Sequence, residues 1–168
     1  MSVSSTLRAL VVDDSPTARL LITSLLESDP EITVVGEATD GEEAVQLANR
    51  LRPDVITMDV HMPNMDGLEA TREIMSTNPT PIVVVTANSP GDVELSLDVT
   101  AAGALIVVEK PRLGDGGRRT EAFEQQRARL IAMVKAMAHV KVVRRWNGRR
   151  QPARTVERRA SRIEPSRP

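Results

Sequence analysis

The chain contains no cysteine and no tyrosine, and only one tryptophan and one phenylalanine, among its 168 residues. The absence of cysteine excludes disulfide bonds, thiol catalysis and cysteine-ligated metals. With so few aromatic residues, the core must be built from Val, Leu, Ile, Ala and Met. No apolar run approaches the roughly 18 residues of a membrane span, and the opening stretch MSVSSTLRALVVDD does not have the pattern of a signal peptide. These absences predict a cytoplasmic protein.

Charge is distributed unevenly along the chain. Residues 1–111 carry 18 acidic and 6 basic side chains, whereas residues 112–168 carry 5 acidic and 16 basic ones. Such a division favours an acidic folded body with a basic C-terminal segment. The simplest interpretation is that the basic segment is solvated. The alternative is a more specific role, in which it binds nucleic acid, anionic lipid or an acidic partner.

Apolar runs recur along the first two thirds of the chain, with amphipathic segments between them. This alternation is typical of a parallel sheet covered by helices. The predicted strands are residues 9–13, 32–38, 54–59, 81–86 and 104–108. The predicted helices follow each strand, the first beginning at Ser15 and Pro16 and the fifth running from about Thr120 to Ala138. The fold class is therefore α/β, a doubly wound five-stranded parallel sheet, although spacing alone does not determine the strand order.

Polar side chains stand where three of the predicted strands end. Such sheets bind ligands beyond the carboxyl ends of their strands, where Asp13, Asp59 and Thr86 would meet if the first, third and fourth strands are neighbours. With Asp14, the two aspartates would form a cluster whose mutual repulsion requires a compensating cation. Mg²⁺ suits such oxygen ligands and shares its coordination with water and phosphate.

The residue types at this edge fit phosphoryl chemistry. A carboxylate such as Asp59 can act as a nucleophile and form an acyl phosphate. The hydroxyl of Thr86 could donate a hydrogen bond to one phosphoryl oxygen. The ammonium group of Lys110, on its flexible side chain, could neutralise the charge of a second phosphoryl oxygen. We also expect a cis peptide bond between Lys110 and Pro111, which would direct the lysine inward.

Four short motifs carry a resemblance to a known family. They are VVDDS, MDVHMPNMDG, VVVTA and EKP, with 45, 27 and 24 residues separating Asp14, Asp59, Thr86 and Lys110. In this order they resemble the receiver domain of two-component response regulators over residues 7 to about 138. The resemblance implies a flavodoxin-like sheet of order 2-1-3-4-5 and phosphorylation of Asp59 by a sensor histidine kinase or phosphotransfer protein.

The resemblance also implies a metal site and a loop. Mg²⁺ would be bound by Asp13, Asp14, Asp59 and the backbone carbonyl of His61, and Pro63 and Gly67 would shape the loop after the phosphoacceptor. The side chain of His61 is expected to be solvated at the mouth of the phosphorylation site, and Asn88 would face the same mouth. Receivers usually carry an aromatic residue three positions before the lysine, where this chain has Val107.

Within the family, the stretch from Pro53 to Val85 and the segment KVVRRW resemble the receiver and linker of chemotaxis protein-glutamate methylesterase. Only 22 residues follow Trp146, and no catalytic triad can be assembled from them. The chain is therefore expected to be a phosphoacceptor signalling domain and not itself an enzyme, either stand-alone or a truncated regulatory piece. A different class of function is the alternative: a scaffold protein that is not phosphorylated and that binds its partner through the basic tail.

The expected domain organisation has three parts. They are an N-terminal extension at residues 1–6, a receiver domain at 7–141 and a basic, flexible tail at 142–168. The receiver would signal to an unidentified downstream protein through its fourth helix, fifth strand and fifth helix. The sequence leaves open whether the protein forms a homodimer, and nucleic acid is not the expected partner.

Overall fold

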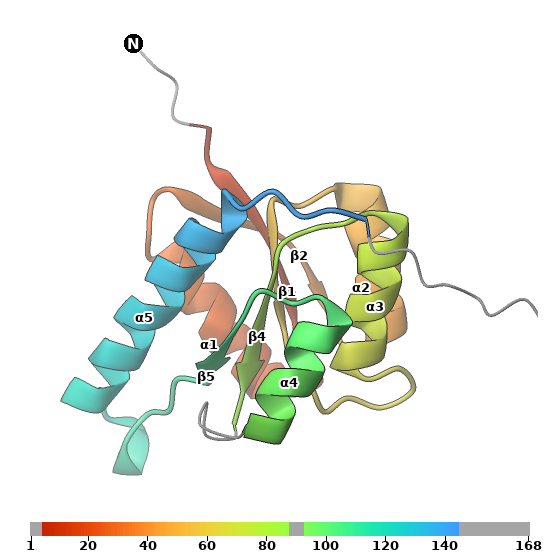
Figure 1. Ribbon diagram of the computed structural model, residues 1–168. Helices are drawn as coiled ribbons and strands as arrows, with labels where there is room; N and C mark the ends of the chain where they lie inside the picture. Colours follow the sequence, from red (N-terminus) through yellow and green to blue (C-terminus); the bar gives the residue numbers. More distant parts are fainter. Residues whose placement is uncertain (1–4, 88–92, 145–168) are drawn as a thin grey trace, which may run out of the picture.

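A central parallel sheet separates two layers of helices (Figure 1). The computed structural model describes residues 5–87 and 93–144. The elements alternate along the chain as β1 (Leu7–Val12), α1 (Pro16–Glu27), β2 (Ile32–Ala38), α2 (Gly41–Leu51), β3 (Val55–Met58), α3 (Gly67–Thr77), β4 (Ile82–Thr86), α4 (Val93–Ala102), β5 (Ile106–Glu109), the short 3₁₀ helix η1 (Asp115–Gly117) and α5 (Glu121–Ala138). All strand pairs are parallel and the order is β2-β1-β3-β4-β5. This order confirms the doubly wound, flavodoxin-like prediction.

Each strand alternates its side chains between two hydrophobic clusters. In β1, Leu10 and Val12 pack into the cluster that also contains residues of α2, α3 and α4. Ala9 and Val11 point to the other face, into the cluster that contains residues of α1 and α5. Because side chains in a strand alternate with a period of two, a strand between two helical layers must be apolar at every position. This explains why the buried strands read as continuous apolar runs.

The helices begin where their sequences provide caps. The hydroxyl of Ser15 accepts the N–H of Ala18, with Pro16 in the first turn of α1. Asp40 caps α2 and Thr120 caps α5 in the same way. A cap satisfies N–H groups that have no partner within the helix. The predicted starts of α1 and α5 are therefore correct to within one residue.

The segment after α5 crosses the end of the sheet at which the strands begin (Figure 1). Arg144 ends this crossing, and its guanidinium donates to the carbonyls of Ser76 at 2.6 Å and Thr77 at 3.3 Å, in the last turn of α3. A cation at a helix C-terminus satisfies carbonyls without helical partners and interacts favourably with the helix dipole. The chain is thereby held beside α3 at residue 144. Trp146 and the rest of the predicted tail lie outside the described residues.

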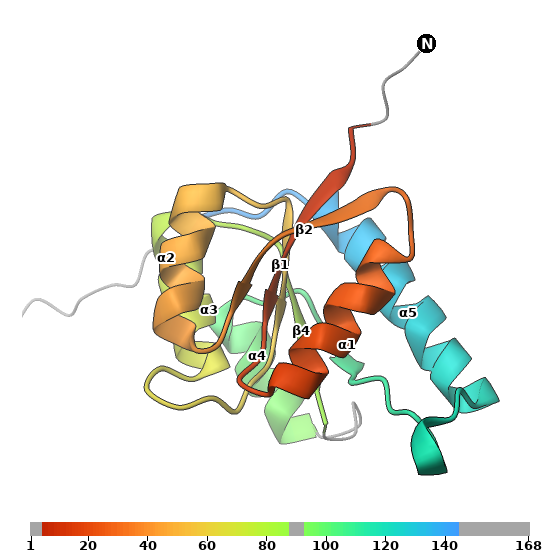
Figure 2. The same cartoon turned by 180° about the vertical axis from the view of Figure 1, so that it is seen from behind.

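The strands all point toward the opposite end of the sheet, at the bottom of Figures 1 and 2. There the β1–α1, β3–α3 and β5–α5 connections gather, so residues that follow the strands come together. Within residues 5–87 and 93–144, none of the helices combines the length and the apolar content needed to cross a lipid bilayer.

Candidate functional site

Three carboxylates meet at the carboxyl end of the sheet. Asp13, Asp14 and Asp59 place ligand oxygens within 4.8 Å of one another. Asp13 is fully buried, Asp59 is 7% exposed and Asp14 lies at the surface. The structure thus brings together the acidic residues that the sequence placed there.

Strand pairing explains this convergence. Val12 and Met58 are partners in the β1–β3 ladder, so Asp13 and Asp59, the residues that directly follow the two strands, lie side by side. The N–H of Asp59 donates to the carbonyl of Val12 at 3.0 Å, which extends the ladder by one bond. Neighbouring parallel strands therefore fix both backbones at the rim.

Local hydrogen bonds orient the two buried carboxylates. The Oδ1 atom of Asp13 accepts the N–H of Ser15 at 2.9 Å, and the Oδ1 atom of Asp59 accepts the N–H of Val60 at 2.9 Å. Ser15, and not either of the preceding aspartates, caps α1. Asp13 and Asp14 are therefore not the capping residues of this helix.

Lys110 supplies a positive charge to the cluster. Its Nζ atom lies 2.6 Å from Oδ2 of Asp13 and 3.7 Å from Oδ2 of Asp59. The contact with Asp13 does not have hydrogen-bond geometry, so we describe it as an ion pair. Lys110 is therefore closer to Asp13 than to the expected phosphoacceptor.

The expectation of a cis bond between Lys110 and Pro111 was wrong. No cis peptide occurs among the described residues. The N–H of Lys110 donates to the carbonyl of Thr86 at 2.8 Å, continuing the pairing of Thr86 with Glu109. The β4–β5 ladder thus already places Lys110 at the carboxyl edge, where its side chain reaches Asp13 with the ordinary trans bond.

Thr86 ends β4 and is buried, so it stands beside Lys110 at the rim. Asn88, which was expected to face the same entrance, lies outside the described residues. His61 is exposed in the β3–α3 connection, as expected for a solvated side chain.

The β3–α3 loop is shaped by residues that sequence reasoning only partly identified. Asn64 adopts a left-handed conformation with φ of 66°, which asparagine tolerates better than most residues, and its side chain donates to Oδ2 of Asp40 at 3.1 Å. Gly67 begins α3 so close to Asp59 that a Cβ atom there would lie 1.9 Å from the Asp59 carbonyl oxygen. The loop thus closes directly onto the backbone of the phosphoacceptor candidate. An Asn in a loop before a helix cap was the available signal for the turn.

Burial raises the pKa of Asp59 above its ordinary value of 3.8, and the nearby Asp13 and Asp14 raise it further. Lys110 and the Val60 N–H act in the opposite direction without cancelling these effects. The ionised carboxylate is thus disfavoured in the folded protein when no other cation is present.

This electrostatic cost predicts that Asp59→Asn stabilises the metal-free protein. At pH 7 with a chelator, we expect the free energy of unfolding to rise by on the order of 1 kcal/mol. Because the folded-state pKa of Asp59 is raised, its cost to stability grows as pH rises from 3.8 to that pKa and is fully present above it, so the gain from the substitution should vanish below pH 3.8. Urea unfolding of the wild type and the variant at pH 7, and again below pH 3.8, measures the gain and its disappearance. Asp98→Asn, an exposed position on α4, serves as control, and a variant less stable than wild type at pH 7 would contradict the argument.

The cluster fits a hard divalent cation. Lys110 pairs with two of the three carboxylates, so their negative charge is not balanced locally. In addition, Oδ2 of Asp13 is buried without a hydrogen bond. Carboxylate oxygens in such an arrangement are the ligands that Mg²⁺ prefers.

The family model for the response regulator receiver domain matches residues 9–115. The chain belongs to this family. Among curated proteins, the receiver is 52% identical over 89% of its length to protein-glutamate methylesterase/protein-glutamine glutaminase 4 of Myxococcus xanthus. It is 49% identical over 83% of its length to a methylesterase of Anaeromyxobacter dehalogenans. The chain spans about two fifths of the length of these relatives (41% and 40%).

Solved structures agree with this assignment. The response regulator domain of Thermotoga maritima CheB is 35% identical, with a TM-score of 0.71, over 81% of this chain and 98% of that one. A chain of the CheX–CheY–BeF3–Mg²⁺ complex from Borrelia burgdorferi is 29% identical, with a TM-score of 0.58, over 73% of this receiver and 86% of that chain. Both match the receiver over most of its length.

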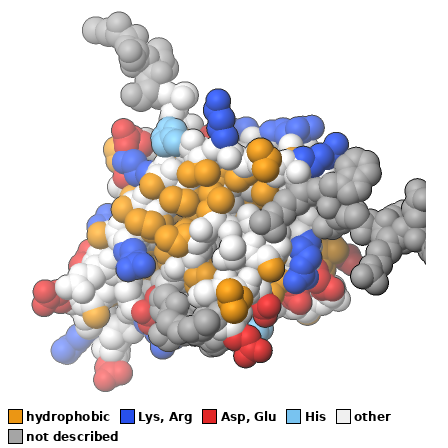
Figure 3. All heavy atoms as spheres, in the orientation of Figure 1, with side chains coloured by type: hydrophobic (Ala, Val, Ile, Leu, Met, Phe, Trp, Pro, Cys, Tyr) orange, Lys and Arg blue, Asp and Glu red, His pale blue; other side chains and the backbone are white. Residues whose placement is uncertain are grey.

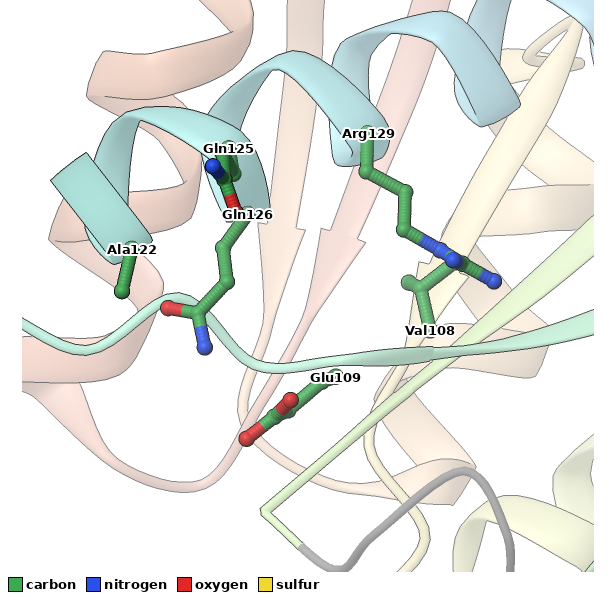
Figure 4. A pocket seen from close by; sticks show the side chains of 6 residues that line it. All are labelled: Val108, Glu109, Ala122, Gln125, Gln126 and Arg129. Carbon is green, nitrogen blue, oxygen red and sulfur yellow. The ribbon is translucent and has the colours of Figure 1, made fainter.

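A separate cleft lies between β5 and α5 (Figure 4), and Asp13, Asp14 and Asp59 are not among the residues that line it. It has a volume of about 500 Å³ and is lined by Val108, Glu109, Ala122, Gln125, Gln126 and Arg129. Hydrophobic side chains gather on the face of the receiver that carries α5, β5 and α4 (Figure 3). Leu97 of α4 is 66% exposed. This face therefore has both an open cleft and accessible apolar surface.

Proposed function

We propose that this receiver accepts a phosphoryl group on Asp59 and carries it as a signal. The observation that supports this function most directly is the position of Asp59, beside Asp13 and with Lys110 within 3.7 Å. A carboxylate beside a buried acid and a lysine has a nucleophilic oxygen and a nearby positive charge. These are the requirements for phosphoryl transfer, in which positioning and charge neutralisation contribute most.

In the proposed reaction, a carboxylate oxygen of Asp59 attacks the phosphorus of a phosphorylated donor. A new P–O bond forms as the bond between phosphorus and the leaving group breaks, and the leaving group departs with that electron pair. Lys110 then faces the phosphoryl oxygens, and Thr86 donates its hydroxyl to one of them. Attack by water on phosphorus later releases phosphate and restores the carboxylate.

Asp13, Asp14, Asp59 and the backbone carbonyl of His61 would hold Mg²⁺ in this proposal. The bound cation would neutralise charge on the carboxylates and on the incoming phosphoryl oxygens. Lys110 has a different task, because it stays paired with Asp13 before the donor arrives. The residues thus divide metal binding and phosphoryl recognition between them.

The experiment is incubation of the purified chain with Mg²⁺ and acetyl phosphate, followed by mass spectrometry. We expect the wild type to gain the mass of one phosphoryl group, the Asp59→Asn variant to gain none, and the Asp98→Asn control to behave like the wild type. Omission of Mg²⁺ should abolish the gain. An Asp59→Asn variant that gained the same mass would refute the assignment, and a wild type that gained none would favour a scaffold that uses the acidic cluster only structurally.

The partners follow from the same proposal. The donor would be a sensor histidine kinase or a phosphotransfer protein in the cytoplasm, and an unidentified downstream protein would bind the face formed by α4, β5 and α5. A phosphate with a charge of about −1.5 to −2 attracts Thr86 and Lys110 and so biases that face between two states. The donor class can be tested with an autophosphorylated chemotaxis-type kinase that carries labelled phosphate. Transfer of the label to the wild type, but not to the Asp59→Asn variant, would identify the donor class. If the wild type accepted phosphate from acetyl phosphate but not from this kinase, this kinase class would be excluded.

A second candidate rests on the curated relatives. Their names, and the two fifths of their length that this chain matches, favour a regulatory domain of a chemotaxis protein-glutamate methylesterase. In that setting Asp59 phosphorylation would control a methylesterase. Sequencing of the gene beyond the codon for Pro168 tests this directly, since an immediate stop codon would exclude it.

A further inference from the structure

Arg112 connects two loops at the rim of the acidic cluster. Its guanidinium Nη2 atom donates to the carbonyl of Ala87, the residue that follows Thr86. Its backbone N–H donates to Oε1 of Gln126 at 3.0 Å. Arg112 is thus fixed to α5 by its backbone and to the end of β4 by its side chain.

This contact completes a pair of bonds around Thr86. The carbonyl of Thr86 accepts the N–H of Lys110 at 2.8 Å, and the carbonyl of Ala87 accepts the arginine. Two successive carbonyls are therefore held from β5 and the segment that follows it. The two carbonyls belong to consecutive peptide units, so these bonds restrain the backbone on the C-terminal side of Thr86 and limit how far its Cα atom and side chain can shift.

Arg112 has no direct contact with the acidic residues of the site. Within the part of the chain that the structure describes, the ion pairs do not include Arg112. The Ala87 contact places the guanidinium next to Thr86, and Thr86 is the site residue through which we expect Arg112 to act on Asp59. Among residues 5–87 and 93–144, no carboxylate forms an ion pair with the guanidinium, which donates to the Ala87 carbonyl instead.

We propose that Arg112 is a positioning residue for phosphoryl transfer to Asp59, which holds Thr86 where its hydroxyl meets the incoming phosphoryl group. This inference rests on the proposed function and adds to it a residue outside the site motifs. Near-attack geometry is sensitive to displacements of the groups that receive the substrate. Loss of the Ala87 contact should therefore slow transfer without changing which residue is modified.

The test compares initial rates of phosphoryl uptake from acetyl phosphate at saturating Mg²⁺, read by mass spectrometry. Arg112→Gln should reduce the rate about fivefold, the factor that corresponds to one ordinary hydrogen bond. Arg112→Met keeps the side-chain stem without a donor and should show the same reduction. The apparent Mg²⁺ requirement should not change, because Arg112 touches none of the metal-binding carboxylates.

Two further variants separate positioning from other effects. Arg119→Gln removes a positive charge from the same connection, where Arg119 is 70% exposed and lies 4.0 Å from Glu124. It should react like the wild type if Arg112 acts by positioning and not by attracting the anionic donor. In a Thr86→Ala background, Arg112→Gln should have no further effect, because the group it positions is gone.

The outcomes distinguish this inference from the function on which it rests. An Arg112→Gln rate equal to that of the wild type, an equal slowing in Arg119→Gln, or the same fivefold loss in the Thr86→Ala background would each overturn the positioning role while Asp59 phosphorylation stands. A wild-type chain that accepts no phosphoryl group would overturn the proposed function itself, and this inference with it.

Discussion

Lys110→Met is expected to destabilise the metal-free receiver by about 3–5 kcal/mol, the usual cost of removing one partner from a buried ion pair. The reason is the environment of Asp13, which is fully buried with Lys110 Nζ 2.6 Å from its Oδ2 atom. Without the lysine, the carboxylate must either stay charged without compensation or take up a proton. Since small domains are stable by about 5–15 kcal/mol in total, urea unfolding in the presence of a chelator should show this loss clearly.

The matched control is Lys135→Met, since Lys135 also pairs with two acids, Asp29 and Glu31, but near the surface. Exposed pairs contribute about 0–1 kcal/mol, so this variant should unfold close to the wild type. Asp13→Asn in the Lys110→Met background should recover much of the loss, because the charge of the fully buried Asp13 is then absent. If Lys110→Met and Lys135→Met unfolded at the same urea concentration, the importance of the Lys110–Asp13 pair would be disproved.

Gly67→Ala should cost about 3 kcal/mol of stability, the upper end of the usual cost of overpacking a core. The added Cβ would lie 1.9 Å from the Asp59 carbonyl oxygen and 3.0 Å from the Val60 Cα atom, and backbone atoms cannot rotate away. The N–H of Gly67 also donates to the Val60 carbonyl at 2.9 Å, which keeps α3 close to the loop. To relieve the clash, α3 must withdraw or the backbone of Asp59 must shift. We therefore also expect slower phosphoryl uptake in whatever fraction folds.

Gly36→Ala in β2 provides the comparison. The Cβ there would meet the end of the Leu51 side chain at 2.7 Å, and that side chain can turn aside. We expect a change of about 1 kcal/mol or less, because alanine also favours an ordered backbone more than glycine does. Thermal unfolding of both variants tests the comparison. Equal losses would mean that the contact of Gly67 with the Asp59 backbone has no special role.

Most of the fold follows from the pattern of apolar residues. Runs such as residues 54–59 and 81–86 had to be strands buried on both faces, and the structure places Val55–Met58 and Ile82–Thr86 there. Strand ends moved by one or two residues, because the apolar pattern does not say where the ladder stops. The strand order came from the resemblance to receivers, since no spacing rule excludes other orders of five parallel strands.

The acidic side chains at the rim were predictable for a simple geometric reason. Asp13 and Asp59 follow strands directly, and parallel strands end at one edge. What the sequence does not contain is the choice among partners: that Lys110 lies closer to Asp13 than to Asp59, or that Arg112 reaches Ala87 across 25 residues. These contacts depend on side-chain conformations that are determined only after the loops pack. The trans bond before Pro111 was mispredicted because proline permits both isomers and the ladder had already placed the lysine.

The contact of Arg144 with the last turn of α3 has a practical consequence for experiments on this receiver. It holds the chain at residue 144 at the end of the sheet opposite the carboxylates, with the guanidinium 2.6 Å from the Ser76 carbonyl. A fluorescent label or an affinity support attached beyond that point starts from the far side of the molecule. Immobilised protein should consequently keep its entrance open to a phosphorylated donor in solution.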